Sequence, residues 1–197
     1  MKLFSTHNSP FSRVARIAIQ ELGLSEEVKI EYVTVRDPNS ELLKYGPLGK
    51  VPALQMNGEL FSDTRIVVAM LESVSTNNRL TASTDNPPSL AFEGFCIGFL
   101  ESIAVWIREA RREPELISEH LLAVEKQRAI RCVEYLSDHS NKLSRELSLA
   151  SIAVACGLDL AKRRLGFIEF EKYSDLNDWF QLITQRASFQ STEPHPI

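Results

Sequence analysis

Cysteine is scarce in this sequence, and its few copies are far apart. The 197 residues include only Cys96, Cys132 and Cys156. An odd number at such wide spacing fits neither a disulfide framework nor a zinc site. Each cysteine stands among apolar residues with helical spacing, so we expect three buried structural thiols and no metal centre.

The sequence also lacks an excess of positive charge and a long apolar run at its start. Its 22 Lys and Arg residues against 26 Asp and Glu give a formal net charge of −4, which provides no basic surface for nucleic acid. Residues 1–7, MKLFSTH, contain no stretch of the signal-peptide or membrane-spanning kind. We therefore expect a cytoplasmic protein that binds neither nucleic acid nor membrane.

The first 75 residues have a mixed pattern of strands and helices. Ser9 and Pro10 are typical of the N-cap and first position of a helix, and Gly23 is typical of its end. Asn57-Gly58, between two apolar runs, is the strongest short signal for a hairpin. The predicted order is strand 2–5, helix 10–22, strand 28–35, irregular chain, strands 53–56 and 59–61, and a helix from about residue 62.

The chain changes character after residue 75. Residues 76–89 are polar and contain Pro87-Pro88, which indicates an interdomain linker. From residue 90 the apolar residues have helical spacing, and the length of the chain allows two small domains. The predicted domains are 1–75, with strands and helices, and 90–197, all helical. The helices expected in the second domain are 90–112, 114–136, 148–163 and 175–186.

Two short segments carry the strongest functional signal. Residues 46–66 contain Gly-Pro-Leu-Gly-Lys-Val-Pro-Ala-Leu and, after a turn, Phe-Ser-Asp-Thr-Arg-Ile; residues 9–11 are Ser-Pro-Phe. The pair Val51-Pro52 is unfavourable in an ordinary central strand, because proline has no amide hydrogen for the ladder. Together the two segments resemble the glutathione pocket of a soluble glutathione S-transferase, and the sequence is most similar to the small bacterial members that contain serine.

This resemblance extends over nearly the whole chain. It implies a thioredoxin-like α/β N-terminal domain followed by an all-α helical C-terminal domain. A cis Val51-Pro52 bond, as in thioredoxin-like folds, leaves the Val51 amide and carbonyl free to pair with a peptide-like ligand as an added strand does. Residues 147–158 resemble the family's buried helix, in which the capping box has Asp where this chain has Ser151. We expect Ser148 to cap that helix and the return bond to be weak or absent.

The resemblance also implies glutathione as a co-substrate in the first domain, with no metal or organic prosthetic group. Ser9 matches the position whose hydroxyl stabilises the glutathione thiolate, and it is the candidate catalytic residue. The same hydroxyl is typical of a helix cap, and one side chain can serve both roles. His7 is close enough in sequence to act as a base, but a loop histidine beside a pocket is more often incidental.

Further glutathione-binding positions follow from the same resemblance. Asp63 and Thr64, at an expected helix start, match the pair that holds the γ-glutamyl group; plain capping is the alternative. Lys50 is expected to pair with the glycyl carboxylate, with a solvated lysine as the alternative, and Val51 is expected to pair through its backbone. Phe11 either walls the pocket near the sulfur or packs in the core beside its helix.

The candidate electrophile pocket lies on the long helix of the second domain. It consists of Trp106, Arg108 and Arg111. Glu109 and Glu113 stand at helical pairing distance from these arginines, so the alternative is a core tryptophan with two solvated arginines.

By resemblance, the chain is expected to be an enzyme that transfers an alkyl or aryl group from a small hydrophobic electrophile to the sulfur of glutathione. The family's role in detoxification and its homodimeric assembly are expected as well. Two other classes share the architecture: a non-catalytic adaptor or regulator of the stringent-starvation type, and another glutathione-dependent enzyme such as an isomerase or dehalogenase. Intact Ser9, Asp63 and Thr64 argue against the adaptor.

Overall fold

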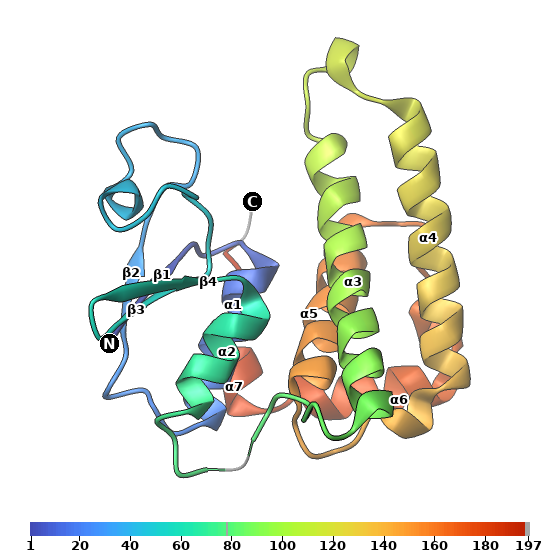
Figure 1. The fold of residues 1–197 in the computed structure, drawn as a ribbon. Helices are drawn as coiled ribbons and strands as arrows, with labels where there is room; N and C mark the ends of the chain where they lie inside the picture. The colour runs from blue at the N-terminus through green and yellow to red at the C-terminus, as the bar shows by residue number, and fades with distance from the viewer. Residues whose placement is uncertain (78, 196–197) are drawn as a thin grey trace. The chain divides into compact units, whose positions relative to one another are not determined.

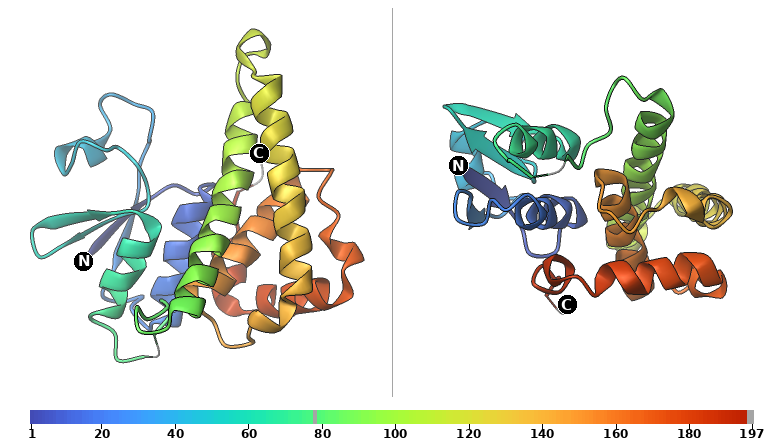
Figure 2. Two further views of the ribbon diagram at one scale, coloured as in Figure 1. Left: turned by 45° about the vertical axis from the view of Figure 1, so that its right-hand side comes forward. Right: turned by 90° about the horizontal axis from the view of Figure 1, so that it is seen from below.

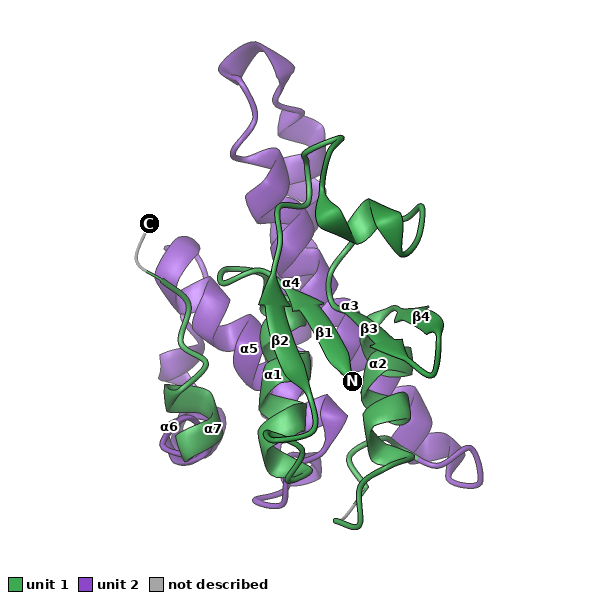
Figure 3. Ribbon diagram, turned by 90° about the vertical axis from the view of Figure 1, so that its left-hand side faces the viewer, with its two compact units in different colours: residues 1–82, 187–197 green, residues 83–186 purple. Residues whose placement is uncertain are grey.

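The protein folds into two compact units (Figures 1 and 3). The computed structural model describes residues 1–77 and 79–195. The first unit comprises residues 1–82 and the segment from residue 187 onward, and the second comprises residues 83–186. The first unit contains strands and helices, whereas the described residues of the second contain helices only. The predicted fold class, a thioredoxin-like domain followed by a helical domain, is confirmed.

A four-stranded mixed sheet forms the centre of the first unit. Its strands are β1 (Lys2–Ser5), β2 (Lys29–Tyr32), β3 (Ala53–Met56) and β4 (Glu59–Ser62), in the spatial order β2-β1-β3-β4. β1 pairs parallel with β2 and antiparallel with β3, and β3 pairs antiparallel with β4. Three strand ends therefore meet at one end of this sheet, where β1 and β4 finish and β3 starts.

Local sequence signals set the turn and the helices of this unit. Asn57 (φ 53°) and Gly58 (φ 86°) connect β3 to β4, and both have the positive φ that the favoured two-residue hairpin turn requires. The helices α1 (Pro10–Glu21) and α2 (Thr64–Glu72) pack against each other, and α2 also contacts β3 and β4. Hairpin and helices thus lie where the sequence predicts them.

The chain between β2 and β3 covers part of the sheet. Its short 3₁₀ helix η1 (Glu41–Lys44) places Leu42 in a buried cluster with Phe4 and Ala53, which are direct partners in the β1–β3 ladder. Val51 is partly buried and packs against the same cluster. This packing fixes the chain that leads into β3.

The segment that follows α2 is bound to the first unit by one carboxylate. Glu72 accepts hydrogen bonds from the backbone amides of Leu80 and Thr81, and from the Thr81 hydroxyl at 2.6 Å. Residues 80 and 81 are therefore held in place rather than forming a free connection, although they lie within the expected linker.

The other end of the expected linker is helical. α3 (Pro87–Glu109) begins at Pro87 and has Pro88 in its first turn. The sequence pattern instead predicts a linker that includes both prolines and a helix start at residue 90. The amide of Ser89 donates to the Asn86 side chain at 3.3 Å, which caps the helix. Proline is tolerated there because the first amides of a helix need no intrahelical acceptor.

The second unit is a bundle of helices (Figure 2). α3 packs against α4 and α5, and α6 also packs against α4 and α5. By length and composition alone α3 is apolar enough to cross a membrane, but its buried Cys96, Phe99 and Ile103 are those of a central bundle helix. The remaining elements of the unit are α4 (Glu119–Asp138), α5 (Leu149–Arg164), α6 (Ser174–Thr184) and the 3₁₀ helices η2 (Pro114–Leu116), η3 (Ser140–Lys142) and η4 (Phe170–Lys172).

Two helix starts in this unit differ from the expectation. The predicted helix 114–136 is divided into η2 and α4, because Ser118 caps α4 by accepting from the Leu121 amide at 3.2 Å. At α5 the capping box is complete, which corrects the prediction of a weak or absent return bond: the Ser148 amide donates to Ser151 Oγ at 2.8 Å, and the Ser151 amide donates to Ser148 Oγ at 3.2 Å. A serine hydroxyl therefore reaches far enough to replace the acidic side chain.

We expect Ser151→Ala to lower the free energy of unfolding by about 1 kcal/mol, because it leaves the Ser148 amide without its acceptor. Ser151→Asp keeps an acceptor at this position and should lose less. Urea unfolding of both variants measures the difference. Equal losses in the two variants would show that the return bond contributes nothing.

Candidate functional site

Three chain segments meet at one end of the sheet in the first unit. In the strand register, Phe4 of β1 lies opposite Ala53 of β3, and Ala53 lies opposite Ser62 of β4. Because β1 and β4 end here and β3 begins here, the residues just beyond these strands come close together. The predicted site residues at this end are Ser9 after β1, Lys50 and Val51 before β3, and Asp63 and Thr64 after β4.

Ser9 is the N-cap of α1. Its Oγ accepts a hydrogen bond from the Ser12 amide at 3.2 Å, and Pro10 occupies the first helical position. A hydroxyl that accepts one bond still has its own hydrogen to donate. The residue also stands at the positive end of the helix dipole, where an anion is stabilised. Capping and donation to an anion are therefore compatible in this one side chain.

Val51 presents its backbone at the edge of the site. The β1–β3 and β3–β4 ladders reach only to Ala53, and within the part of the chain that the structure describes no backbone hydrogen bond involves Val51. The Val51–Pro52 peptide bond is cis. With its side chain packed on the Phe4 cluster, Val51 can offer amide and carbonyl to an extended peptide-like ligand.

The start of α2 combines a cap with an unusual backbone conformation. Asp63 has φ 77°, and its side chain accepts a hydrogen bond from the Arg65 amide at 2.9 Å. Thr64, the first residue of the helix, is 6% exposed. Positive φ is uncommon for residues other than glycine, although Asp tolerates it better than most. The first amides of α2 remain suited to binding a carboxylate.

The other two predicted glutathione-binding residues have less constrained positions. Phe11 is half-buried in the first turn of α1, so its ring is neither fully in the core nor fully exposed. Lys50 is exposed, and no ion pair of Lys50 is found among the described residues. Its ammonium group is therefore available to an anion at the same end of the sheet.

The structure does not bring the predicted electrophile residues together. The Trp106 ring meets the edge of the Phe167 ring at 5.2 Å between centroids, whereas Arg108 Nε donates to the Ala104 carbonyl at 3.3 Å. Trp106 and Arg108 are two residues apart on α3, which separates them by about 200° around the helix. Arg111 lies beyond the end of α3 and is exposed. The two arginines and the tryptophan thus do not form one pocket wall.

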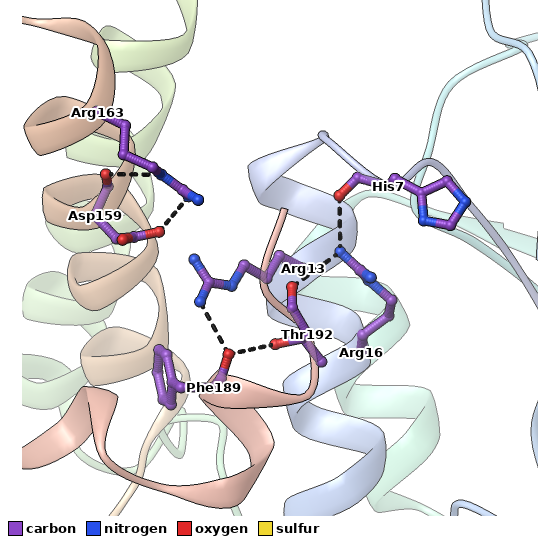
Figure 4. Close-up of polar contacts among 7 residues, drawn as sticks. All are labelled: His7, Arg13, Arg16, Asp159, Arg163, Phe189 and Thr192. Atoms are coloured by element: carbon purple, nitrogen blue, oxygen red, sulfur yellow. Dashed lines mark hydrogen bonds and ion pairs between the residues drawn. The ribbon is translucent and has the colours of Figure 1, made fainter. Parts of the chain in front are cut away.

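Sequence reasoning missed a polar group behind the loop that carries Ser9. The Arg16 guanidinium is buried and donates to the His7 carbonyl at 3.0 Å (Figure 4). It also donates to the Tyr32 hydroxyl at 3.4 Å. The His7 ring stacks on the Tyr32 ring at 3.7 Å between centroids. The one available signal was an arginine among the buried positions of a helix, and it does not identify the partners.

The described residues hold no group of three or more His, Cys, Asp and Glu side chains arranged for a metal ion. Cys96 and Cys156 are buried and Cys132 is partly buried, and none of the three forms a disulfide. Burial raises the pKa of the Cys96 thiol to about 12. Burial also raises the pKa of the Cys132 thiol, so these two cysteines are unsuited to act as thiolates.

Comparisons with known proteins agree on one family. Residues 3–79 match the family model for the glutathione S-transferase N-terminal domain. The chain is 26% identical to the uncharacterized GST-like protein YibF of Escherichia coli (strain K12), over 98% of each chain. It is also similar to the structure of a glutathione transferase family member from Pseudomonas fluorescens Pf-5 with bound glutathione (25% identity, TM-score 0.88, covering 100% of this chain and 99% of that one). The fold of a glutathione S-transferase from Methylobacillus flagellatus KT matches with a TM-score of 0.87 at 23% identity, over 98% and 99% of the two chains.

The start of α2 yields a stability test. Asp63→Ala should lower the free energy of unfolding by about 1–3 kcal/mol, because it removes the cap and places a less tolerant residue at positive φ. Asp63→Asn keeps an acceptor and tolerates this conformation, so it should lose much less. Urea unfolding distinguishes the two. An equal loss in both variants would contradict this account of the helix start.

Proposed function

Because the chain belongs to the glutathione S-transferase family, we propose that it binds glutathione at the end of the sheet in its first unit and transfers an alkyl or aryl group to the glutathione sulfur. The observation that carries this proposal is the convergence, at one sheet end, of a helix-capping hydroxyl, an unpaired backbone segment and a second helix start. These three features offer one group for each part of the tripeptide.

Ser9 is the proposed catalytic residue. An ordinary thiol has a pKa of about 8.5, so only a few per cent of free glutathione is thiolate at neutral pH. The Ser9 hydroxyl donates a hydrogen bond to the sulfur while its oxygen continues to cap α1, and the helix dipole favours the same negative charge. Each unit by which the pKa of the bound thiol falls corresponds to about 1.4 kcal/mol of stabilisation of the thiolate.

The remaining groups hold the tripeptide. The γ-glutamyl carboxylate binds the first amides of α2 and the Thr64 hydroxyl, with Asp63 in polar contact with the same moiety. The cysteinyl backbone pairs with Val51, and Lys50 pairs with the glycyl carboxylate. Phe11 covers the sulfur side of the site.

The reaction then needs no further group. In a substitution the thiolate sulfur forms a bond to the electrophilic carbon as the bond to the leaving group breaks, and the leaving group departs with the electron pair. In an addition to an activated double bond, the neighbouring carbon takes up a proton from water, which balances the proton that the thiol released.

The second unit supplies the electrophile site in this proposal. Because Trp106 and Arg108 lie on different sides of α3, only the ring pair Trp106–Phe167 is proposed as aromatic surface for a hydrophobic electrophile. We also propose that the protein is a cytoplasmic homodimer that acts in detoxification. Sedimentation of the purified protein tests the assembly.

The first experiment is a calorimetric titration of the purified protein with reduced glutathione, followed by turnover with a panel of halogenated aromatic compounds and activated alkenes. Binding together with turnover supports the transferase. Binding without turnover favours another glutathione-dependent enzyme, such as an isomerase or dehalogenase. No binding at millimolar glutathione overturns the proposal and favours a non-catalytic adaptor.

Substitution of Ser9 separates capping from thiol activation. Ser9→Ala should raise the pKa of bound glutathione and cost about 1 kcal/mol of stability. Ser9→Asp retains an acceptor for the Ser12 amide, so its stability should stay near that of the wild type, but its negative charge should raise the thiol pKa further. Thiolate absorbance against pH measures this. If Ser9→Asp leaves the thiol pKa unchanged, Ser9 only caps the helix.

Substitution of Thr64 tests the γ-glutamyl site. Thr64→Val has nearly the same shape but lacks the hydroxyl, and we expect it to weaken glutathione binding by about 0.5–1.5 kcal/mol. The matched control Thr64→Ser keeps the hydroxyl and should bind more tightly than Thr64→Val. Calorimetry measures affinity, and thermal unfolding measures stability. A loss of stability without loss of affinity would mean that Thr64 only supports the helix start.

A further inference from the structure

The last described segment of the chain lies along α1 in the first unit. Residues 187–195, which we call the C-terminal segment, begin with the short helix α7 (Ala187–Gln190). The Arg13 guanidinium donates to the Phe189 carbonyl at 3.0 Å, and that of Arg16 donates to the Thr192 carbonyl at 3.4 Å (Figure 4). Both arginines are 4% exposed. The segment thus provides buried acceptors for two buried cations.

Further along α1 the same side of the helix makes two more contacts with the segment. The Ser188 hydroxyl donates to Glu21 at 2.5 Å, and the Ser191 hydroxyl donates to Gln20 at 2.9 Å. Phe189 is buried as well. Residues 13, 16 and 20 repeat at helical spacing, so one stripe of α1 binds the whole segment.

Arg16 connects this segment to the loop that carries Ser9. The Nη2 atom that donates to Thr192 also donates to the carbonyl of His7, two residues before Ser9, at 3.0 Å. Its Nη1 donates to the Tyr32 hydroxyl at 3.4 Å. One guanidinium therefore joins the Ser9 loop, the end of β2 and the C-terminal segment.

Three aromatic rings complete this connection. The His7 ring lies 3.7 Å from the Tyr32 ring at an interplanar angle of 10°, and 3.9 Å from the His195 ring at 24°. Two near-parallel contacts this short require opposite faces of His7, so the C-terminal segment closes a stack that starts on β2. The stack thus adds a second link between the Ser9 loop and the C-terminal segment.

The charges around His7 are all positive or neutral. The groups that face it are Tyr32 from β2, Arg16 from α1 and His195 from the C-terminal segment. None of the carboxylates in the described ranges forms an ion pair with His7, Arg16 or His195. Burial, His195 and Arg16 each lower the pKa of His7. A proton on His7 is therefore opposed by the arrangement itself.

We infer that His7, Arg16 and His195 form an acid-sensitive clasp that fixes the C-terminal segment to the Ser9 loop and thereby positions the Ser9 hydroxyl. The positioning half of this inference rests on the proposed function, whereas the clasp itself does not. Arg16, His7 and His195 are positioning residues, because they act on the sulfur only through the loop.

The direction of the pH effect follows from the lowered pKa of His7. The closed clasp binds fewer protons than the open form. Its stability is therefore fully present above the ordinary histidine pKa of about 6.5, and it is lost as the pH falls through the lower pKa that His7 has in the closed clasp. Acid should therefore open the clasp, and neutral pH should close it.

Hydrogen exchange of the full-length protein tests the clasp without any ligand. Protection of amides 187–192 should fall by several-fold to about tenfold when the pH is lowered from about 7.5 to about 5.5. It is measured relative to amides of α5 in the same sample, because the intrinsic rate of amide exchange itself depends on pH. Equal relative protection at both pH values would overturn the acid-sensitive clasp.

Two substitutions of His195 sharpen this test, since residue 195 is exposed and its replacement should not prevent folding. His195→Ala should lower protection already at neutral pH, because it removes one ring of the stack. His195→Phe keeps a ring but removes an imidazole that opposes a proton on His7, so its protection should depend less on pH. His120→Ala, at an exposed position of α4, is the matched control and should behave as the wild type. Equal exchange in all variants would refute a role for the stack.

Positioning is tested by the pKa of bound glutathione. His195→Ala should raise that pKa while the protein stays folded, whereas His120→Ala should leave the pKa unchanged. An unchanged thiol pKa together with a loosened segment would overturn the positioning half and leave a structural clasp. Absence of glutathione binding in the wild type would refute the proposed function, and the exchange experiment would still decide on the clasp.

Discussion

The hydrogen bonding of β3 between β1 and β4 determines where each candidate binding group of the first unit lies. The antiparallel pairs Phe4–Ala53 and Ala53–Ser62 place two strand ends and one strand start at the same end of the sheet. Side chains alternate along a strand, so a slip of one residue would turn Ala53 away from Leu42 and move Val51 off its cluster. The helix starts at Ser9 and Asp63 take their positions from this register, because each follows a paired strand within a few residues.

Most of the fold was predictable because its signals are local. Ser9-Pro10 marks a helix start and Asn57-Gly58 a hairpin through the backbone conformations that these residues favour, and neither depends on distant partners. Pro87-Pro88 was misassigned because the same pair that marks a linker is also tolerated in the first turn of a helix. The bond from the Ser148 amide to Ser151 was not predicted, because a capping box depends on whether the side-chain oxygen lies close enough to the cap amide and not on residue type alone.

The candidate site was predictable where it lies on short contiguous segments that resemble a known family, as at residues 9–11 and 50–64. The second unit was harder, since Trp106 and Arg108 are close in sequence but point to different sides of α3. The contact of Arg16 with Thr192 was the hardest to predict from the sequence, because it joins residues that are 176 positions apart. A contact of that range leaves no periodic trace in the sequence, so only the folded chain reveals it.

The first unit is built from two pieces of chain, since residues 83–186 are inserted between α2 and the segment that binds along α1. A ribosome therefore releases the sheet and both of its helices well before it makes Phe189 and Thr192. Until those residues emerge, the buried guanidinium groups of Arg13 and Arg16 have neither of these carbonyl acceptors, and a nascent thioredoxin-like domain remains incomplete. Completion of this domain during synthesis thus waits until residues 187–192 have been made, even though most of its described residues are made first.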